Sequence, residues 1–359
     1  MSDSAKMLLG RKPRALALLV SATILAVLAV KVNVRLHAPH GQQPNLVDQL
    51  RQVNWFILLG TFGLSASWHM ALGADKWWRI LRAMGSRARW IEVFRVRLGS
   101  DPIRFASPLK AGELVNAIYF GRVDAFGFSQ AAGSIAFDKA INFVGTLVWL
   151  YVGTAALSQV PAFGHILLHT CLGAAILTVL AVRWPREMLR RTACRVHSKL
   201  GRFITGILAA FEEFSLGQKI AFLAYGVIFQ LRPLIVCYLL FLAINPRHMP
   251  SLEESIAFGS VAVLMSNIPF TVAGIGPREA AIMALFAPYA DQMTLLGVGV
   301  LMSFSIHVVP AIIGIPFMFG LLRTLAATQP AVGEARTEPE GGDARAGLPV
   351  MPRAAAMTE

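Results

Sequence analysis

The stretch SNIPFTVAGIGPREAAIMALF, residues 266–286, interrupts an apolar sequence with residues that break helices and carry charge. Two prolines and two glycines interrupt the helical pattern: Pro269, Gly274, Gly276 and Pro277. The charged residues Arg278 and Glu279 follow directly. Non-helical backbone at membrane depth is tolerated only where it faces protein or a water-filled cavity. If the flanking sequence is membrane-embedded, the stretch predicts a turn between two half-helices beside a polar interior.

The composition around this stretch is that of a membrane protein. Of the 359 residues, 55% are hydrophobic and 15% are charged, whereas soluble domains contain about 45–50% apolar and about 25% charged residues. Most of the apolar runs are long enough to cross a hydrocarbon core of about 30 Å. They lie at 15–30, 54–73, 133–157, 163–182, 219–244 and 295–322. We therefore expect an all-α, polytopic transmembrane helix bundle.

The net charge of +13 does not indicate nucleic acid as a partner, because the basic residues sit in the segments between apolar runs. That placement is what membrane topology requires. The cysteines Cys171, Cys194 and Cys237 have no paired spacing, so the sequence predicts neither a disulfide framework nor a zinc site. It predicts no metal and no cofactor.

Lysine and arginine counts between the runs set the expected topology. There are ten in 74–130 and eight in 183–219, but one in 245–253 and none in 287–294. By the positive-inside rule, the N-terminus and the two rich segments are cytoplasmic. The C-terminus is then cytoplasmic as well.

These assignments divide the chain into three parts. Residues 1–14 are a cytoplasmic N-terminus, 15–325 a transmembrane domain, and 326–359 a disordered cytoplasmic tail rich in Ala, Pro, Gly and Glu. The run at 15–30 has the charged start of a signal peptide, but basic residues follow it and no clear cleavage site is present. An uncleaved first helix is the preferred interpretation.

The topology places both ends of 254–290 outside the membrane. Its apolar halves, 255–268 and 280–290, are each short for a span. They form either a re-entrant hairpin of half-helices or two short spans.

A second broken segment, residues 90–122, begins and ends on the cytoplasmic side. Its centre is SPLKAGE, in which we expect Ser107 to cap a helix and Pro108 to take the first helical position. Glu113 falls in the first turn, where the helix dipole favours an anion. Two broken or re-entrant segments of opposite topology are the pattern of inverted repeats, with half-helix ends meeting near the midplane. Simple kinks at glycine and proline are the alternative.

Arg232 lies in the middle of the run 219–244. An arginine at the bilayer centre costs at least about 2.5–3.5 kcal/mol on insertion scales. It is predicted either to bind an anionic headgroup, because guanidinium matches phosphate geometry, or to form an ion pair with Asp138 or Glu279. The sequence favours neither.

Other polar residues support weaker expectations. Asp138 and Asn142 are four residues apart and share a helix face, while Lys139 points elsewhere and snorkels towards the surface. His307 is expected to be a buried, hydrogen-bonded histidine. Four tryptophans and the arginines between 79 and 97 are expected to form a headgroup-level belt; the tryptophans are Trp68, Trp77, Trp78 and Trp90.

Three motifs resemble the family of the lysylphosphatidylglycerol synthase transmembrane (flippase) region. They are SPLKAGELVNAIYFGR (107–122), FDKAINFVG (137–145) and NIPFTVAGIGPREAAI (267–282). They are similar to the family's Pro–Gly–Glu break, its acidic–basic pair in the next helix and its Pro–Gly–Gly–Arg–Glu break. Lys139 stands where the family usually has arginine. The resemblance covers roughly residues 10–325, and about 34 residues remain for a tail, so we expect no aminoacyl-transferase domain and no lipid synthesis.

The resemblance implies an integral protein of the bacterial inner membrane that translocates or handles a phospholipid or a polyisoprenoid or glycolipid. Its partners would be the bilayer, the lipid substrate and, as one option, a pathway enzyme. The alternative is an accessory subunit or enzyme of a lipid- or glycan-modifying pathway, although we find no catalytic constellation. The predicted substrate-binding residues are Lys110, Gly112, Glu113, Asp138, Lys139, Arg232, Gly274, Gly276, Arg278 and Glu279.

Overall fold

The computed structural model describes residues 53–107, 112–123, 126–157, 162–180, 214–246, 248–267 and 276–327. Every regular element in this part of the chain is a helix, as predicted. The expected first helix at 15–30 and almost all of the tail lie outside it.

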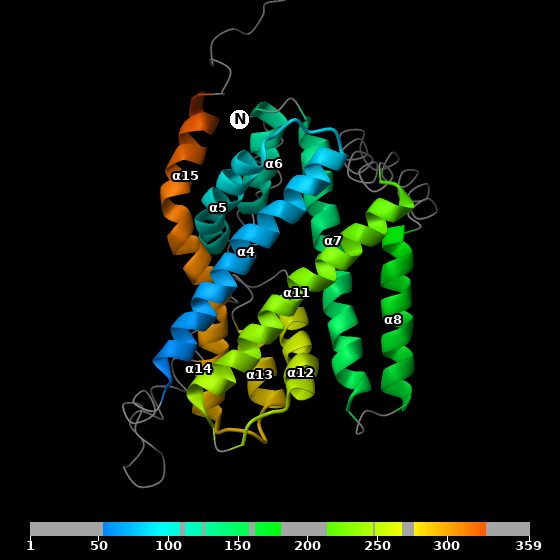
Figure 1. Ribbon diagram of the computed structural model, residues 1–359, viewed down its shortest axis with the longest axis vertical. Coiled ribbons are helices and arrows are strands. Elements are labelled where there is room, and N and C mark those ends of the chain that lie inside the picture. Colours follow the sequence, from blue (N-terminus) through cyan, green and yellow to red (C-terminus); the bar gives the residue numbers. More distant parts are fainter. Residues whose placement is uncertain are drawn as a thin grey trace, which may run out of the picture.

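Four helical stretches of the described chain are long and apolar enough to cross a membrane. They are α4 (Trp55–Ala83), α7 (Phe128–Ala155), α11 (Leu216–Ile244) and the stretch Gln292–Ala327. The last consists of α14 (Gln292–Ser303), the π-helical turn η2 (Phe304–Val308) and α15 (Val309–Ala327). These stretches run along the long axis of the molecule, and α8 (Ala162–Leu180) lies beside α7 (Figure 1). The expectation of a polytopic helix bundle is confirmed.

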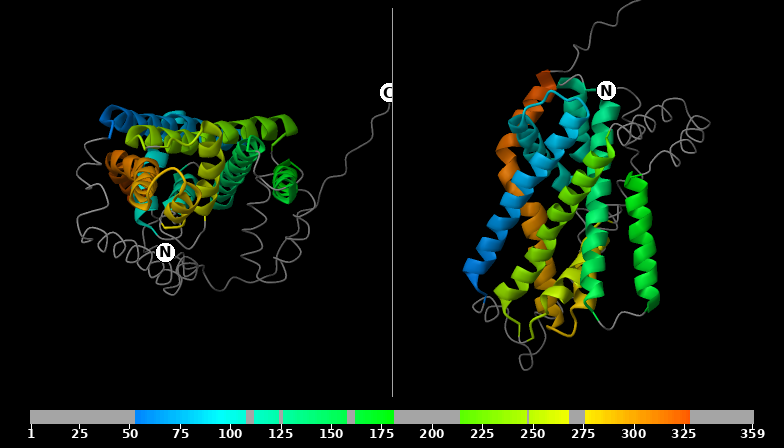
Figure 2. Two further views of the ribbon diagram at one scale, coloured as in Figure 1. Left: turned by 90° about the horizontal axis from the view of Figure 1, so that it is seen from below. Right: turned by 45° about the vertical axis from the view of Figure 1, so that its right-hand side comes forward.

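Two pairs of shorter helices complete the bundle. The first is α5 (Trp90–Ala106) with α6 (Gly112–Val123), and the second is α12 (Leu252–Met265) with α13 (Pro277–Leu285). The two pairs lie towards opposite ends of the molecule, as both side views show (Figures 1 and 2). Each pair coincides with one of the broken segments of the sequence.

The first helix of each short pair packs closely on a long helix at a glycine. Helix α5 packs on α15 and α12 packs on α7. A Cβ atom at Gly314 would lie 2.2 Å from the carbonyl oxygen of Leu98, and one at Gly153 would lie 2.5 Å from the amide nitrogen of Ala257. Only glycine permits these approaches.

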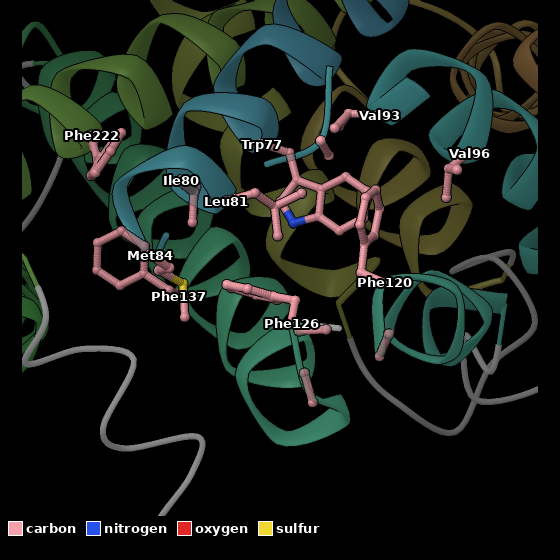
Figure 3. Packing of buried hydrophobic residues seen from close by; sticks show 14 of the residues in the cluster. Trp77, Ile80, Leu81, Met84, Val93, Val96, Phe120, Phe126, Phe137 and Phe222 are labelled. Carbon is pink, nitrogen blue, oxygen red and sulfur yellow. The ribbon is translucent and has the colours of Figure 1, made fainter. Parts of the chain in front are cut away.

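Two apolar clusters form the core. The Trp77 cluster joins α4, α5, α6 and α7 at one end and includes Phe120 and Phe137 (Figure 3). The Phe241 cluster joins α11, α12, α13 and α14 at the other end and includes Phe286. Trp77 is 1% exposed and its indole nitrogen donates to the Ser134 hydroxyl at 3.1 Å, so the prediction that it belongs to a headgroup belt is wrong.

One helix boundary differs from the expectation. Helix α4 continues to Ala83, past the expected end at 73, because Ala74, Trp77 and Ile80 extend its buried face. Ser107 is the C-cap of α5. Its expected role as the N-cap of the next helix depends on residues 108–111, which lie outside the described residues, and stays a prediction.

Candidate functional site

Buried polar side chains lie between the two apolar clusters. Helix α4 contacts the Phe241 cluster through Leu58 and the Trp77 cluster through Trp77. Between these two residues it carries the buried polar side chains of Ser65, His69 and Lys76. Helix α7 carries Asp138 and Thr146 in the same zone, and α11 carries Arg232. The middle of the bundle is therefore a charged layer enclosed by apolar ends.

The start of α13 has the structure predicted for the quoted stretch. Gly276 has φ 105°, a backbone conformation that favours glycine, and Pro277 takes the first helical position. One carboxylate oxygen of Glu279 accepts from the Gly276 amide at 2.6 Å. The other accepts from the Ser303 hydroxyl at 2.5 Å. Glu279 thus caps its own helix and ties it to α14.

Arg278 points from α13 towards the π-helical turn. Its guanidinium donates to the Ser303 hydroxyl at 3.0 Å and lies 3.1 Å from His307 Nε2. The Arg278 side chain is buried, and its Nε has no hydrogen-bond partner in the described residues. His307 is hydrogen-bonded as expected, but it is only partly buried and its neighbour is a cation. Single π-helical turns are frequent at functional sites.

Arg232 forms neither of the ion pairs weighed from the sequence. Its Nη1 donates to the Ser65 carbonyl oxygen at 3.4 Å, and its guanidinium lies 5.5 Å from the centroid of the Phe229 ring. Among the described residues, Asp138 pairs elsewhere and Glu279 accepts from Ser303 and Gly276. The ion-pair alternative is wrong, and the headgroup-binding role stays a prediction.

Asp138 pairs instead with Lys76, which the sequence reasoning placed in a cytoplasmic segment. The Lys76 ammonium lies 2.8 Å from the Asp138 carboxylate and also donates to the side-chain oxygen of Asn142. Asn142 donates to Asp138 at 3.2 Å, which confirms that these two share a face. Lys76 lies seven residues after His69 and therefore on the same face of α4. Extending the helical periodicity past residue 73 would have indicated from the sequence that Lys76 is buried.

Glu113 and Lys139 contact each other, although Lys139 was expected to point elsewhere. Their charged atoms are 2.5 Å apart, with the Lys139 side chain 46% exposed. The pair links α6 to α7. A Cβ atom at Gly112 would lie 2.3 Å from the Arg104 amide nitrogen, so the start of α6 is pressed against α5.

A further buried pair joins α4 to α5 and was also missed. His69 Nε2 lies 3.0 Å from the Asp101 carboxylate, whose other oxygen contacts the Arg104 guanidinium at 2.5 Å. The i, i+3 spacing of Asp101 and Arg104 was a visible signal. Nothing local in the sequence indicates His69 as the third member.

The two short helix pairs contain matching Glu–Tyr contacts. Glu92, the third residue of α5, accepts from the Tyr119 hydroxyl of α6 at 3.0 Å. Glu254, the third residue of α12, is hydrogen-bonded by Tyr289, which follows α13. In both pairs a first-turn glutamate of the first helix is joined to a tyrosine in or just after the second helix.

Two predicted site residues, Lys110 and Gly274, lie outside the described residues. Of the other eight, Asp138 pairs with Lys76 and Arg232 lies against Phe229, and the remaining six fall into two groups. Arg278, Glu279 and Gly276 meet at the start of α13, while Glu113, Lys139 and Gly112 meet at the start of α6. Within the described chain, no group of three or more His, Cys, Asp or Glu residues could hold a metal ion.

Comparison with protein families identifies the chain. A search of curated proteins found no similar sequence. The model of the lysylphosphatidylglycerol synthase TM region matches residues 14–314, which contain both broken segments and the charged layer. This chain is therefore a membrane protein of the lysylphosphatidylglycerol synthase transmembrane-region family.

Proposed function

We propose that this protein translocates a lipid by moving its headgroup through the charged layer between the two short helix pairs. The acyl chains would stay in the bilayer. The observation that carries the proposal is the placement of buried cations between two short helix pairs at opposite ends of the bundle.

The short pairs would be re-entrant, each beginning and ending at one face of the membrane. At 1.5 Å per residue, α12 and α13, with 14 and 9 residues, extend about 21 Å and about 14 Å, which is short of the hydrocarbon thickness of about 30 Å. The matching Glu–Tyr contacts and the matching glycine contacts support an inverted repeat, a common plan of transporters.

Arg278 would be one of the headgroup ligands. Its guanidinium is held in one orientation by Ser303 and His307, so little side-chain freedom is lost when it binds an anion.

Single cysteines placed at exposed helix ends, in a background without the native cysteines, test the architecture. We expect positions 89 and 122 to react with an impermeant thiol reagent from one face of the membrane, and positions 251 and 291 from the other. A re-entrant pair and two short spans both keep the ends on one face, so cysteines at positions 111 and 273, between the paired helices, separate the two arrangements. If either of these reacts only from the face opposite to the ends of its pair, the helices span the membrane and the re-entrant proposal is wrong.

The full chain in liposomes with a fluorescent phospholipid tests transport, by measuring how much label becomes accessible to a membrane-impermeant quencher. We expect transport by the wild type, at least tenfold slower transport by Arg278→Lys, and unchanged transport by Arg323→Lys, an exposed arginine of α15. Absence of transport by the wild type across phospholipid and polyisoprenoid probes would contradict the function. Equal rates for wild type and Arg278→Lys would contradict only the role of Arg278.

A further inference from the structure

The ring of Phe229, on α11, is surrounded by basic side chains from two neighbouring helices and from α11 itself. The Lys76 ammonium lies 4.2 Å from the ring centroid, and the Arg232 guanidinium lies 5.5 Å from it. Arg97 of α5 approaches the same place, because a Cβ atom at Gly73 would contact both the Arg97 guanidinium and the Phe229 ring. This group is built on α4, α5 and α11, whereas the contacts of Arg278 are made with α14 and η2.

The charges at this location do not balance. Lys76 is paired with Asp138, and Arg104 with Asp101. Arg97 and Arg232 form no ion pair with any carboxylate in the described residues, although the charges of Asp101 and Asp138 act on Arg97, and that of Asp101 acts on Arg232, from a distance. Two guanidinium groups therefore remain without an ion-pair partner.

Both of these arginines are buried and incompletely hydrogen-bonded. Arg97 is 8% exposed and Arg232 is 7% exposed. The Nε atom of each has no hydrogen-bond partner in the described structure. Removing a cation from water without a partner is strongly unfavourable, so the arrangement is one that an anion would stabilise.

The local packing leaves room for the Arg97 guanidinium. A Cβ atom at Gly73 would lie 3.1 Å from Arg97 Nε and 3.2 Å from Phe229 Cε2. A glycine on α4 thus lets an arginine of α5 lie flat against the helix, next to the aromatic ring. The packing of α4 against α5, with Phe229 of α11 beside it, therefore fixes the position of the Arg97 side chain inside the bundle.

We propose that Arg97 and Arg232 together bind the phosphate group of an anionic ligand, beside Phe229. Planar guanidinium groups donate paired hydrogen bonds to phosphate oxygens, and two unpaired positive charges match the one or two negative charges of a phosphate ester. The Arg97–Arg232 site deepens the proposed function by adding a second anion site to that of Arg278. Only the assignment of the phosphate to a lipid rests on the proposed function.

Binding can be measured on the purified full-length protein in a neutral detergent, without transport. Thermal unfolding is followed during titration with phosphatidylglycerol, glycerol 3-phosphate and inorganic phosphate, with diacylglycerol as the uncharged comparison. We expect phosphate-bearing ligands to raise Tm in a saturable manner and diacylglycerol to have no effect. Stabilisation by phosphatidylglycerol alone identifies a lipid headgroup; stabilisation by the soluble phosphates as well identifies a site for free phosphate.

Variants locate the site. We expect Arg97→Gln to weaken phosphate binding at least tenfold and Arg232→Gln to do the same. Arg95→Gln, which changes an exposed arginine two residues away on α5, is the matched control and should bind like the wild type. Phosphate binding that is unchanged in both Arg97→Gln and Arg232→Gln overturns the proposal, as does a wild type that no phosphate ligand stabilises.

A second measurement separates a ligand-binding arginine from a structural one. Arg97→Met keeps the length of the aliphatic stem and removes the unpaired charge. If Arg97 serves a ligand, this variant should unfold at the same or a higher temperature than the wild type without ligand, and should lose the phosphate-dependent rise. A lower Tm without ligand, together with a full phosphate-dependent rise, shows a purely structural role. Neither measurement depends on lipid transport. If the arginine variants lose phosphate binding but the wild type transports no lipid, the phosphate site stands and only the lipid-transport function is rejected.

Discussion

The α5–α6 and α12–α13 pairs share a plan but are held in place differently. In each pair, the first helix packs on a long helix at a glycine and its first-turn glutamate is joined to a tyrosine. The second helix carries a glutamate in its first turn, either Glu113 or Glu279. These shared features are what two halves of an inverted repeat would retain.

The difference lies in what the second glutamate contacts. Glu279 is 1% exposed and bonds within its own turn and to Ser303 of α14. Glu113, whose side chain is 16% exposed, forms ion pairs with the half-exposed Lys139 of α7 and, at 4.0 Å, with Arg104 of α5. Ion pairs that water reaches contribute about 0–1 kcal/mol, whereas a fully buried carboxylate that loses a partner costs more. The start of α6 is therefore held less firmly than the start of α13.

The glycine contacts should give the largest effects, because backbone cannot move aside. Gly314→Ala places a methyl group 2.2 Å from the Leu98 carbonyl oxygen and Gly153→Ala places one 2.5 Å from the Ala257 amide. We expect each to destabilise the protein by about 1–3 kcal/mol or more, measured as a lower Tm in detergent. Gly320→Ala, on α15 with no atom within 4 Å of the new methyl group, should be neutral or stabilise by up to about 1 kcal/mol. A Gly314→Ala protein as stable as Gly320→Ala would contradict the close α5–α15 packing.

The glutamates at the starts of α6 and α13 should give the next largest effects, and unequal ones. In Glu279→Gln only one side-chain oxygen can accept, so either the Gly276 amide or the Ser303 hydroxyl loses its partner. The expected cost is about 1–3 kcal/mol, with faster hydrogen exchange confined to the start of α13. Glu113→Gln should cost no more than about 1 kcal/mol. Equal losses of stability in the two variants would show that the two pairs are held alike.

Prediction from sequence succeeded where the chemistry is local. Proline at the first helical position, glycine before it and glutamate two residues later define the start of α13 by rules that involve only neighbouring residues, and the structure has that start. Apolar runs likewise gave the long helices, since lipid imposes their length.

It failed where a cation follows an apolar run. Lys76 and Arg97 were assigned to cytoplasmic segments because lysine and arginine usually mark loops. In the structure both are buried: α4 continues past the apolar run, and α5 packs back into the bundle. The partners of Lys76, Asp138 on α7 and Phe229 on α11, come from distant segments of the chain, and no short-range pattern specifies such contacts.

The Glu–Tyr contacts should give the smallest effects and can sharpen the comparison through pH. Tyr289→Phe and Tyr119→Phe each remove one hydrogen bond to a first-turn glutamate, at an expected cost of about 0.5–1.5 kcal/mol. Tyr289 and Glu254 lie near the ends of the α12–α13 pair, outside the long apolar spans. Burial, assisted by the hydrogen bond to Glu254, raises the pKa of Tyr289 to about 12, and the Tyr289 hydroxyl lowers the pKa of Glu254.

These pKa shifts fix the pH window of the contact. A raised tyrosine pKa contributes stability below the unfolded value of about 10, and that stability is lost as pH rises through about 12. A lowered glutamate pKa contributes stability above the unfolded value of about 4.3, lost as pH falls through the folded pKa. The Tm difference between wild type and Tyr289→Phe should therefore be constant near neutral pH and shrink at both extremes. A difference as large at pH 3 as at pH 7 would show that Tyr289 stabilises α12 by packing and not through the Glu254 carboxylate, and the parallel with Glu92 and Tyr119 would then fail on chemical grounds.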